Sequence, residues 1–383
     1  MDSIITEITT SPSAIQLGFY LKNNFDSAFR EGNGIVSLIK TKIICTLGPA
    51  VDNYEKIKAL ILNGMEVARF NLSHQNCEDY KRMYEMVKKV QAELGRSVAT
   101  MMDTKGPKIR LGVFEKEKIM LKDGQKFVIT TKDVIGNEEQ ASIKLKSLPR
   151  ELEVGCKVYI DDGLLELSVL EAGEEEIVCV ISRGGVVSSH KGVNLPRVKF
   201  DGAFINEEDK KDLLCGANLG FDFVAASFVR SSADVANIRE LLATCGSKMK
   251  VIAKIENREG VDNIKEILEG ADGVMVARGD LGIEIPFEEL PSIQKEIVSL
   301  ACKMGKTAIV ATQMLSSMVN RQIPTRAEST DIANAVYDGA SAVMLSEETA
   351  AGKYPIEALR TMRRIVECAD RDIEKFGVAS RKS

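Results

Sequence analysis

Residues 250–257 have the sequence KVIAKIEN, a short apolar run that carries a cation and a carboxylate near its end. If this run is a strand, the alternation of side chains places Lys254 and Glu256 on one face and their apolar neighbours on the other. A cation and a carboxylate that point together into a cleft can hold a phosphate and a metal ion at once. A second apolar run, VMVARGDLG at residues 274–282, supplies another carboxylate, Asp280.

Apolar runs of this kind recur along the chain, and each ends in polar or glycine residues. The run at 274–282 belongs to one that begins at residue 273 (GVMVARGD). Six more begin at residue 42 (KIICTLGP), 66 (EVARFNLSH), 97 (SVATMMDTKG), 222 (DFVAASFVRS), 307 (TAIVATQM) and 342 (AVMLSEET). Between most of them the apolar residues recur at i, i+3 and i+4, which predicts helices. Eight strand–helix units predict a closed (β/α)8 TIM barrel. A doubly wound open sheet is the alternative, but no GxGxxG motif follows the first strand.

The interval between the third and fourth runs is much longer than the others. Residues 113–200 contain short, often alternating apolar runs, with turn signals between them and no helix pattern. We therefore expect a small all-β domain inserted after the third barrel strand, at the mouth where barrel active sites lie. It would act as a lid that excludes water, or it is an inert insertion. The expected divisions are an N-terminal arm (1–40), a first part of the barrel (41–107), the lid (108–205) and a second part of the barrel (206–383).

Composition limits the class of protein. The 383 residues are 44% hydrophobic and carry a net charge of −5, which argues against a nucleic-acid or membrane-surface binder. No apolar run reaches the roughly 20 residues that span a bilayer, and the start of the chain has no basic leader. Eight cysteines without a CxxC pair, and two histidines, argue against a zinc site. We expect a cytoplasmic protein with reduced, mostly buried thiols.

Polar side chains end six of the predicted strands. They are Arg69, Asn71, Ser73 and His74; Asp103 and Thr104; Lys254 and Glu256; Arg278 and Asp280; Thr312 and Gln313; Ser346 and Glu347. One such residue would be a solvated loop or a helix cap, but six strand ends at one mouth favour a shared site. Two carboxylates with hydroxyls and amides suit Mg²⁺ or Mn²⁺, and two cations, Arg69 and Lys254, suit a phosphoryl group. The pattern predicts metal-assisted phosphoryl transfer.

A series of motifs then resembles the pyruvate kinase family, in the order that the family has them, over about residues 41–376. They are KIICTLGPA, VARFNLSH, MMDTKGPKIR, KGVNLP, AKIENREG, VMVARGDLGIEIP, ATQMLSSM, PTRAE and MLSEETAAGKYP. The resemblance implies a (β/α)8 barrel with an inserted β lid. It also implies the last step of glycolysis, which moves the phosphoryl group of phosphoenolpyruvate to ADP and gives pyruvate and ATP.

The resemblance assigns roles to the matching positions of this chain. It implies catalytic roles for Lys254, Arg69, Thr312 and Ser346, with Thr312 at the enolate face and Ser346 in a hydroxyl–water relay that protonates enolpyruvate. It implies Mg²⁺ or Mn²⁺ ligands at Glu256 and Asp280, and a monovalent-cation site at Asn71, Ser73, Asp103 and Thr104. Substrate contacts are expected from Arg69, Lys254 and Thr312, and from the backbone of Ala277, Arg278, Gly279 and Asp280. Nucleotide contacts are expected from Arg110, His74 and Lys191.

The chain departs from the family pattern in places. Gln75, His190 and Arg197 stand where the family usually has Gly, Lys and Gly, which puts the nucleotide contacts in question. The family usually continues into a C-terminal domain with a sugar-phosphate effector site. Since this chain stops earlier, we expect no such regulation, and whether the chain is naturally short or truncated stays open.

Lys108 stands where members of the family that need K⁺ usually have Glu. A fixed ammonium group at that position would supply the charge of K⁺ and make the ion dispensable, and Leu111 fits the same interpretation. Thr104 and Lys105 are typical of the K⁺-dependent group, so the signature is mixed. The alternative is that Lys108 is a solvated residue at the hinge of the lid.

Other functions stay open at this point. One is a weakened paralogue that acts as a binding or regulatory subunit, and another is a metal-dependent lyase or aldolase of pyruvate. We expect a homodimer formed through the barrel near residues 324–328 (PTRAE), and neither a nucleic acid nor a membrane as a partner.

Overall fold

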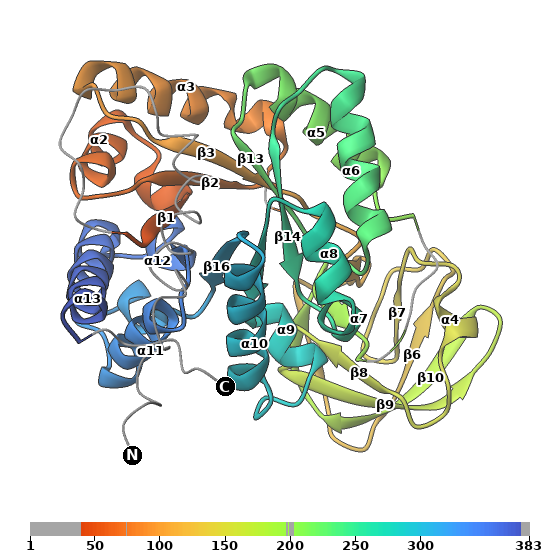
Figure 1. Ribbon diagram of the computed structural model, residues 1–383. Helices are drawn as coiled ribbons and strands as arrows, with labels where there is room; N and C mark the ends of the chain where they lie inside the picture. Colours follow the sequence, from red (N-terminus) through yellow and green to blue (C-terminus); the bar gives the residue numbers. More distant parts are fainter. Residues whose placement is uncertain (1–39, 74, 197, 199–202, 377–383) are drawn as a thin grey trace, which may run out of the picture.

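The computed structural model describes residues 40–73, 75–196, 198 and 203–376. Eight parallel strands close into a barrel in the order β1-β17-β16-β15-β14-β13-β3-β2 (Figure 1). The strands are β1 (Lys42–Leu47), β2 (Val67–Asn71), β3 (Ala99–Asp103), β13 (Phe223–Ala226), β14 (Lys250–Ile255), β15 (Gly273–Ala277), β16 (Thr307–Ala311) and β17 (Ala342–Leu345). All eight predicted strands are confirmed. The doubly wound open sheet is excluded, because β1 pairs with both β17 and β2.

Alternation along the strands divides the apolar side chains into two sets. One set fills the interior of the barrel with aliphatic side chains, methionines and Phe223; it includes Ile44 and Met101. The other set points outward and packs against the helices in a larger apolar core. Because both faces of each strand are buried, the strands are continuous apolar runs, as parallel sheets require.

Helices surround the barrel and connect its strands. They are α2 (Tyr54–Leu62), α3 (Cys77–Leu94), α5 (Glu207–Leu219), α6 (Ser232–Thr244), α7 (Arg258–Asp262), α8 (Ile264–Gly270), α9 (Arg278–Glu284), α10 (Leu290–Lys303), α11 (Arg326–Tyr337), α12 (Glu347–Ala350) and α13 (Pro355–Phe376), with 3₁₀ turns η1 (Pro49–Val51) and η2 (Ser316–Val319). Capping boxes begin α3 and α11. Helix α13 closes the ring next to α11 and β1 (Figure 1).

The segment between β3 and α5 forms a separate β structure beside the barrel, at the lower right of Figure 1. Seven strands form one sheet in the order β4-β12-β8-β9-β10-β6-β7, and β11 pairs with β5. Their bounds are β4 (Ile109–Arg110), β5 (Lys118–Leu121), β6 (Lys126–Thr130), β7 (Gln140–Ser142), β8 (Lys157–Ile160), β9 (Leu165–Ala172), β10 (Glu176–Arg183), β11 (Gly185–Ser188) and β12 (Gly192–Asn194). This insertion has its own apolar core. The structure adds one helical turn, α4 (Leu148–Glu151), where the sequence predicted no helix.

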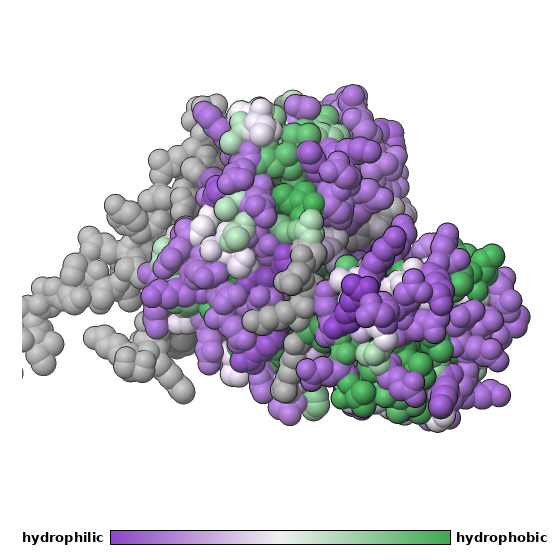
Figure 2. All heavy atoms as spheres, turned by 90° about the vertical axis from the view of Figure 1, so that its right-hand side faces the viewer, coloured by the Kyte–Doolittle hydropathy of each residue, from purple (hydrophilic) through white to green (hydrophobic). Residues whose placement is uncertain are grey.

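The surface of the insertion carries scattered apolar side chains. Figure 2 shows apolar areas among charged ones on the lower lobe of the molecule. The exposed large apolar residues of the insertion are Val113, Met120, Ile135, Val154, Leu164, Leu170 and Val186. No helix within the described residues is long and apolar enough to cross a membrane.

The cysteines are less buried than the sequence predicted. None of the eight is in a disulfide, but only Cys45, Cys77 and Cys179 are buried. Cys245, which follows the end of α6, and Cys368, in α13, are exposed, and the other three are partly exposed.

Candidate active site

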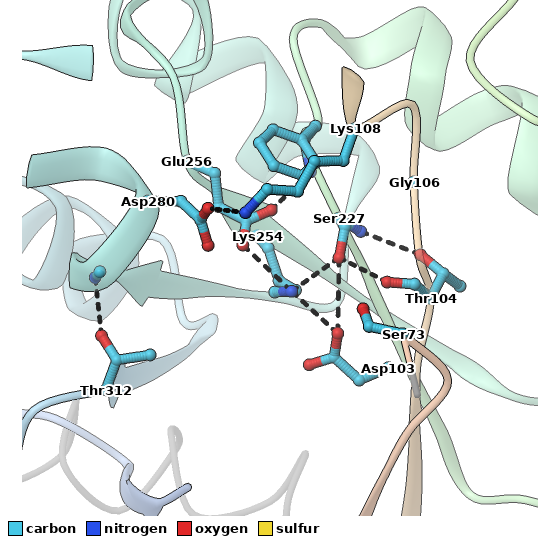
Figure 3. A network of polar contacts seen from close by, with 12 residues as sticks. Ser73, Asp103, Thr104, Gly106, Lys108, Ser227, Lys254, Glu256, Asp280 and Thr312 are labelled. Atoms are coloured by element: carbon cyan, nitrogen blue, oxygen red, sulfur yellow. Dashed lines mark hydrogen bonds and ion pairs between the residues drawn. The ribbon is translucent and has the colours of Figure 1, made fainter. Parts of the chain in front are cut away.

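The ammonium group of Lys254 lies at the centre of a buried polar cluster at the carboxyl ends of the barrel strands (Figure 3). Its Nζ is 2.8 Å from Asp103 Oδ1, 2.6 Å from Ser227 Oγ and 3.1 Å from Glu256 Oε1. Lys254 is 7% exposed and the two carboxylates are 1% exposed. The cation and carboxylate of the KIEN motif therefore meet in one site, together with a carboxylate from β3.

The cluster keeps both its central lysine and Asp103 charged. Burial alone would lower the pKa of Lys254, but the charges of Asp103 and Glu256 outweigh burial and raise it. Burial alone would raise the pKa of Asp103, but Arg69 and Lys254 outweigh burial and lower it. Both groups are therefore ionised at neutral pH.

Arg69 is the second buried cation of the site. Its Nε donates to Asp103 Oδ2 at 2.8 Å, and its NH1 group donates to Thr46 Oγ1 at 2.8 Å. Asp103 is thus shared by two cations, since its other oxygen accepts from Lys254. Glu256 also contacts Lys254, so the two cations are held by two carboxylates, and their remaining donors can contact the oxygens of a phosphoryl group.

Glu256 and Asp280 are the pair of carboxylates on the other side of Lys254. Glu256 Oε2 accepts a hydrogen bond from the backbone N–H of Phe228 at 2.7 Å. Burial raises the pKa of Glu256 to about 7; Lys254 opposes the rise and Asp280 adds to it. A divalent cation between the two carboxylates would relieve the same repulsion that the proton relieves. Two carboxylates with this coupling fit a hard divalent ion such as Mg²⁺ or Mn²⁺.

No group of three or more His, Cys, Asp or Glu side chains that could hold a metal ion occurs within the described ranges. The fit to a divalent ion therefore rests on Glu256 and Asp280 alone.

Lys108 forms an ion pair with one of these carboxylates, Asp280. Its Nζ is 2.7 Å from Asp280 Oδ1 and 3.7 Å from Asp162 Oδ1, and it lies over the ring of Phe228. Its chain crosses Gly192 so closely that a Cβ there would be 2.7 Å from Lys108 Cε. Lys108 therefore links the insertion to the barrel, and its charge lies beside an expected divalent-ion ligand.

The expected monovalent-cation residues lie around Asp103. Thr104 Oγ1 accepts from the backbone N–H of Ser227 at 3.1 Å, and the Thr104 carbonyl accepts from Ser227 Oγ at 2.7 Å. Asn71 Oδ1 accepts from the backbone N–H of Ser73 at 3.3 Å. Because Asp103 already faces two fixed cations, it offers little net negative charge to a third.

The loops after β16 and β17 carry Thr312 and Ser346. Thr312 Oγ1 accepts from the backbone N–H of Gly279, at the start of α9 (2.8 Å; Figure 3). The hydroxyl of Ser346 is buried and has no hydrogen-bond partner among the described residues. Glu348 joins the two loops, since it accepts from the backbone N–H groups of Leu315 (2.9 Å) and Ser346 (2.7 Å).

The substrate contacts expected from residues 277–280 lie at this same start of α9. The N–H of Gly279 is already bound to Thr312, and the guanidinium of Arg278 binds the Thr312 carbonyl and Asp331. The side chain of Arg278 is therefore committed to protein contacts.

A cleft of about 1780 Å³ lies between the barrel and the insertion. Its lining residues include Ser73, Lys108, Arg110, His190, Phe228 and Glu284. Arg110 donates from its NH1 group to the carbonyl of His190 at 3.1 Å. Lys191 pairs with Asp161 at 2.7 Å and does not line the cleft. His74 lies outside the described residues.

Sequence reasoning missed three residues of the site. Ser227 follows β13 directly, so the rule applied to six other strand ends would have found it. Phe228 contributes through its backbone N–H, which no residue type reveals. Glu284, whose pKa burial raises to about 7, accepts from the Asn194 amide of the insertion at 3.1 Å, a contact between segments far apart in the chain.

The fold and the site together define a (β/α)8-barrel protein with buried cations and carboxylates at the carboxyl ends of its strands, facing an inserted β structure. The family model described as the barrel domain of pyruvate kinase matches residues 38–359. The chain belongs to the pyruvate kinase family.

Three relatives show how much of the family's length the chain covers. The pyruvate kinase of Geobacillus stearothermophilus is 48% identical over 347 residues, which are 90% of this chain and 59% of that protein. That of Clostridium perfringens is 44% identical over 88% of this chain and 71% of its own length. That of Staphylococcus saprophyticus is 46% identical over 86% of this chain and 57% of its own length.

Proposed function

We propose that this chain transfers the phosphoryl group of phosphoenolpyruvate to ADP and gives pyruvate and ATP. The observation that carries the proposal is the pair of buried cations, Arg69 and Lys254, which both bind Asp103 at the carboxyl ends of the barrel strands. Phosphoryl transfer needs positioning and neutralisation of charge more than covalent catalysis. Two fixed, desolvated cations supply both for the oxygens of the transferring group.

Glu256 and Asp280 would hold the divalent ion, Mg²⁺ or Mn²⁺. When bound, such an ion polarises phosphoryl and carbonyl oxygens as a Lewis acid. The protein's own contribution is to keep Glu256 oriented through the Phe228 N–H and to keep Lys254 charged beside it. Lys108 would release Asp280 when the ion binds, since both compete for the same carboxylate.

Protonation of the enolate would fall to Thr312 and Ser346. Thr312 Oγ1 accepts the Gly279 N–H, so its own hydrogen is left to donate. The buried Ser346 hydroxyl, which has no partner within the part of the chain that the structure describes, suits a site that a water molecule completes.

The cleft between the barrel and the insertion would take the nucleotide. Arg110 lines it and suits phosphate oxygens, whereas Lys191 would have to leave Asp161 to reach them. In this proposal residues 41–107 and 206–383 form the barrel and residues 108–205 form a lid, which excludes water from the transfer.

The remaining proposals concern ions and partners. We infer that K⁺ is dispensable, that the chain acts in the cytoplasm with the rest of glycolysis, and that it forms a homodimer near residues 324–328. Ile323, beside that segment, is 73% exposed, which supports an interface there. Light scattering that finds only monomer would overturn the dimer.

The test of the function is an assay of ATP and pyruvate formed from phosphoenolpyruvate and ADP, with Mg²⁺ present. The proposal predicts both products in equal amounts. Binding of phosphoenolpyruvate without ATP formation would instead favour a regulatory paralogue. Cleavage or condensation of pyruvate without any need for ADP would favour a lyase or aldolase.

A further inference from the structure

The backbone of Thr312 is in a conformation that its side chain disfavours. Its φ is 68°, and Gln313 follows with φ 54°. A β-branched residue in the left-handed region is a steric outlier, because its Cβ substituents crowd the backbone. Such a conformation persists only where the surroundings hold it in place. The contacts of Thr312 therefore show what holds it.

Three hydrogen bonds hold Thr312, and all come from the first two residues of α9. The Gly279 N–H donates to Oγ1 at 2.8 Å. Arg278 donates to the Thr312 carbonyl twice, from Nε at 3.1 Å and from its NH2 group at 2.6 Å. Side chain and backbone are thus fixed from the same side, so the rotamer and the strained φ are set together.

Arg278 is itself held by Asp331, on α11. The NH1 group of Arg278 is 2.9 Å from Asp331 Oδ1 and 2.7 Å from Oδ2. The planar guanidinium presents its donors in fixed directions, so the contact at NH1 sets where Nε and NH2 point. Arg278 is 8% exposed, so its contact with the Thr312 carbonyl is buried. The contacts therefore run from Asp331 through Arg278 to Thr312.

We propose that Arg278 and Asp331 are positioning residues for Thr312, which aim its hydroxyl for protonation of the enolate. This inference rests on the proposed function and adds residues that its chemistry does not touch. In that step the methylene carbon of the enolate gains a proton from solvent, through the hydroxyl relay, and the enolate oxygen becomes the ketone oxygen of pyruvate. If the Thr312 hydroxyl is not held in position, this protonation step slows. Phosphoenolpyruvate still binds at Arg69 and Lys254.

The test separates proton transfer from phosphoryl transfer. Asp331→Asn and Arg278→Lys are compared with the unmodified protein by kcat and KM for phosphoenolpyruvate. They are also compared by exchange of pyruvate methyl protons in D₂O with Mg²⁺, followed by proton NMR. We expect kcat and the exchange rate to fall about 10- to 100-fold, and KM to stay within about twofold. Arg278→Lys keeps the positive charge but loses the planar guanidinium with its fixed donors. Its kcat and exchange rate should therefore fall as those of Asp331→Asn do.

Asp338→Asn is the matched control. Asp338 ends the same helix and pairs with Lys295 at 2.5 and 2.7 Å, but this ion pair does not reach Thr312. We expect unchanged kcat and exchange. Unchanged exchange in both Asp331→Asn and Arg278→Lys, or an equal loss in Asp338→Asn, would overturn the inference. If the unmodified protein forms no ATP, the proposed function fails first, and the inference fails with it.

Discussion

At the scale of single residues, the site depends on buried charges that offset one another. Asp103 accepts hydrogen bonds from both Arg69 and Lys254, and Glu256 lies on the other side of Lys254. Buried charges are tolerated only when they are paired. This arrangement keeps two buried cations in place at the strand ends, where they can contact the oxygens of a phosphoryl group.

Replacement of Lys254 tests the role of that charge directly. Lys254→Met should lower kcat by at least about 10³-fold, because it removes the charged group that we propose acts on the transferring phosphate. Affinity for Mn²⁺ should change little. Lys250→Met, at the other end of the same strand, is the control and should keep kcat. A Lys254→Met protein with near-normal kcat would remove Lys254 from the mechanism.

The raised pKa of Glu256 predicts how metal binding depends on pH. The pKa rises from 4.5 to about 7 in the metal-free protein, so binding must displace a proton at lower pH. Affinity for Mn²⁺ should therefore increase as the pH rises to about 7 and level off above it. Glu256→Gln and Asp280→Asn should weaken binding, and only Asp280→Asn should keep a pH dependence. Titration calorimetry at several pH values measures this; wild-type affinity in both variants would exclude them as ligands.

The same shift has a consequence for stability. Because the folded-state pKa is raised, the folded protein favours the protonated form. The contribution of Glu256 to stability is then present below pH 4.5 and is lost as the pH rises to about 7. Urea unfolding of the metal-free protein should show this loss, and Glu256→Gln should reduce it.

At the scale of elements, the eight barrel strands could be predicted because each is a short apolar run with polar residues at its end. The polar residues at the strand ends could then be predicted to share one site, because the carboxyl ends of the parallel strands of a barrel lie at the same mouth. The partners of these residues could not be predicted in this way. Arg278 with Asp331, and Lys108 with Asp280, join segments 53 and 172 residues apart, and no local pattern encodes such contacts. The α4 turn was missed for a different reason: at four residues it is too short for a helical period.

The K⁺ prediction rests on Lys108, which lies in the first connection between the barrel and the insertion. We expect substantial activity in buffer free of K⁺ and Na⁺, because fixed ammonium and guanidinium groups already surround the site. Lys108→Glu should make activity depend on K⁺, since it replaces the ammonium beside Asp280 with a carboxylate. Lys116→Glu, an exposed substitution on the insertion, is the control. An unmodified protein that is nearly inactive until K⁺ is added would contradict this reading of Lys108.

At the scale of the whole molecule, α13 ties the end of the barrel to its beginning. Asp370, which is 5% exposed, accepts from the backbone N–H groups of Lys40 (2.8 Å) and Thr41 (3.1 Å), and from Thr41 Oγ1 (3.1 Å). This one carboxylate holds the chain where β1 enters the barrel. Hydrogen bonds as well as apolar packing therefore hold α13 to the start of β1.

Removal of the Asp370 carboxylate should lower the free energy of unfolding and leave the catalytic activity unchanged. Asp370→Ala leaves buried donors without an acceptor, so the free energy of unfolding should fall by about 1–3 kcal/mol. Asp372→Ala on the same helix, where the carboxylate is partly exposed and accepts from Tyr337 Oη, should cost less than about 1 kcal/mol. Urea titrations of the two variants measure these free energies. Equal losses in the two variants would mean that the Asp370 hydrogen bonds do not stabilise the start of β1.

The central claim is that the buried cations and carboxylates of this chain transfer a phosphoryl group from phosphoenolpyruvate to ADP. A phosphorus NMR time course with Mg²⁺ tests it most directly, because it follows the transferred atom. The account predicts that the phosphoenolpyruvate signal falls while the γ-phosphate signal of ATP rises by the same amount, and that a metal chelator stops both changes. An unchanged spectrum, or inorganic phosphate in place of ATP, would contradict it.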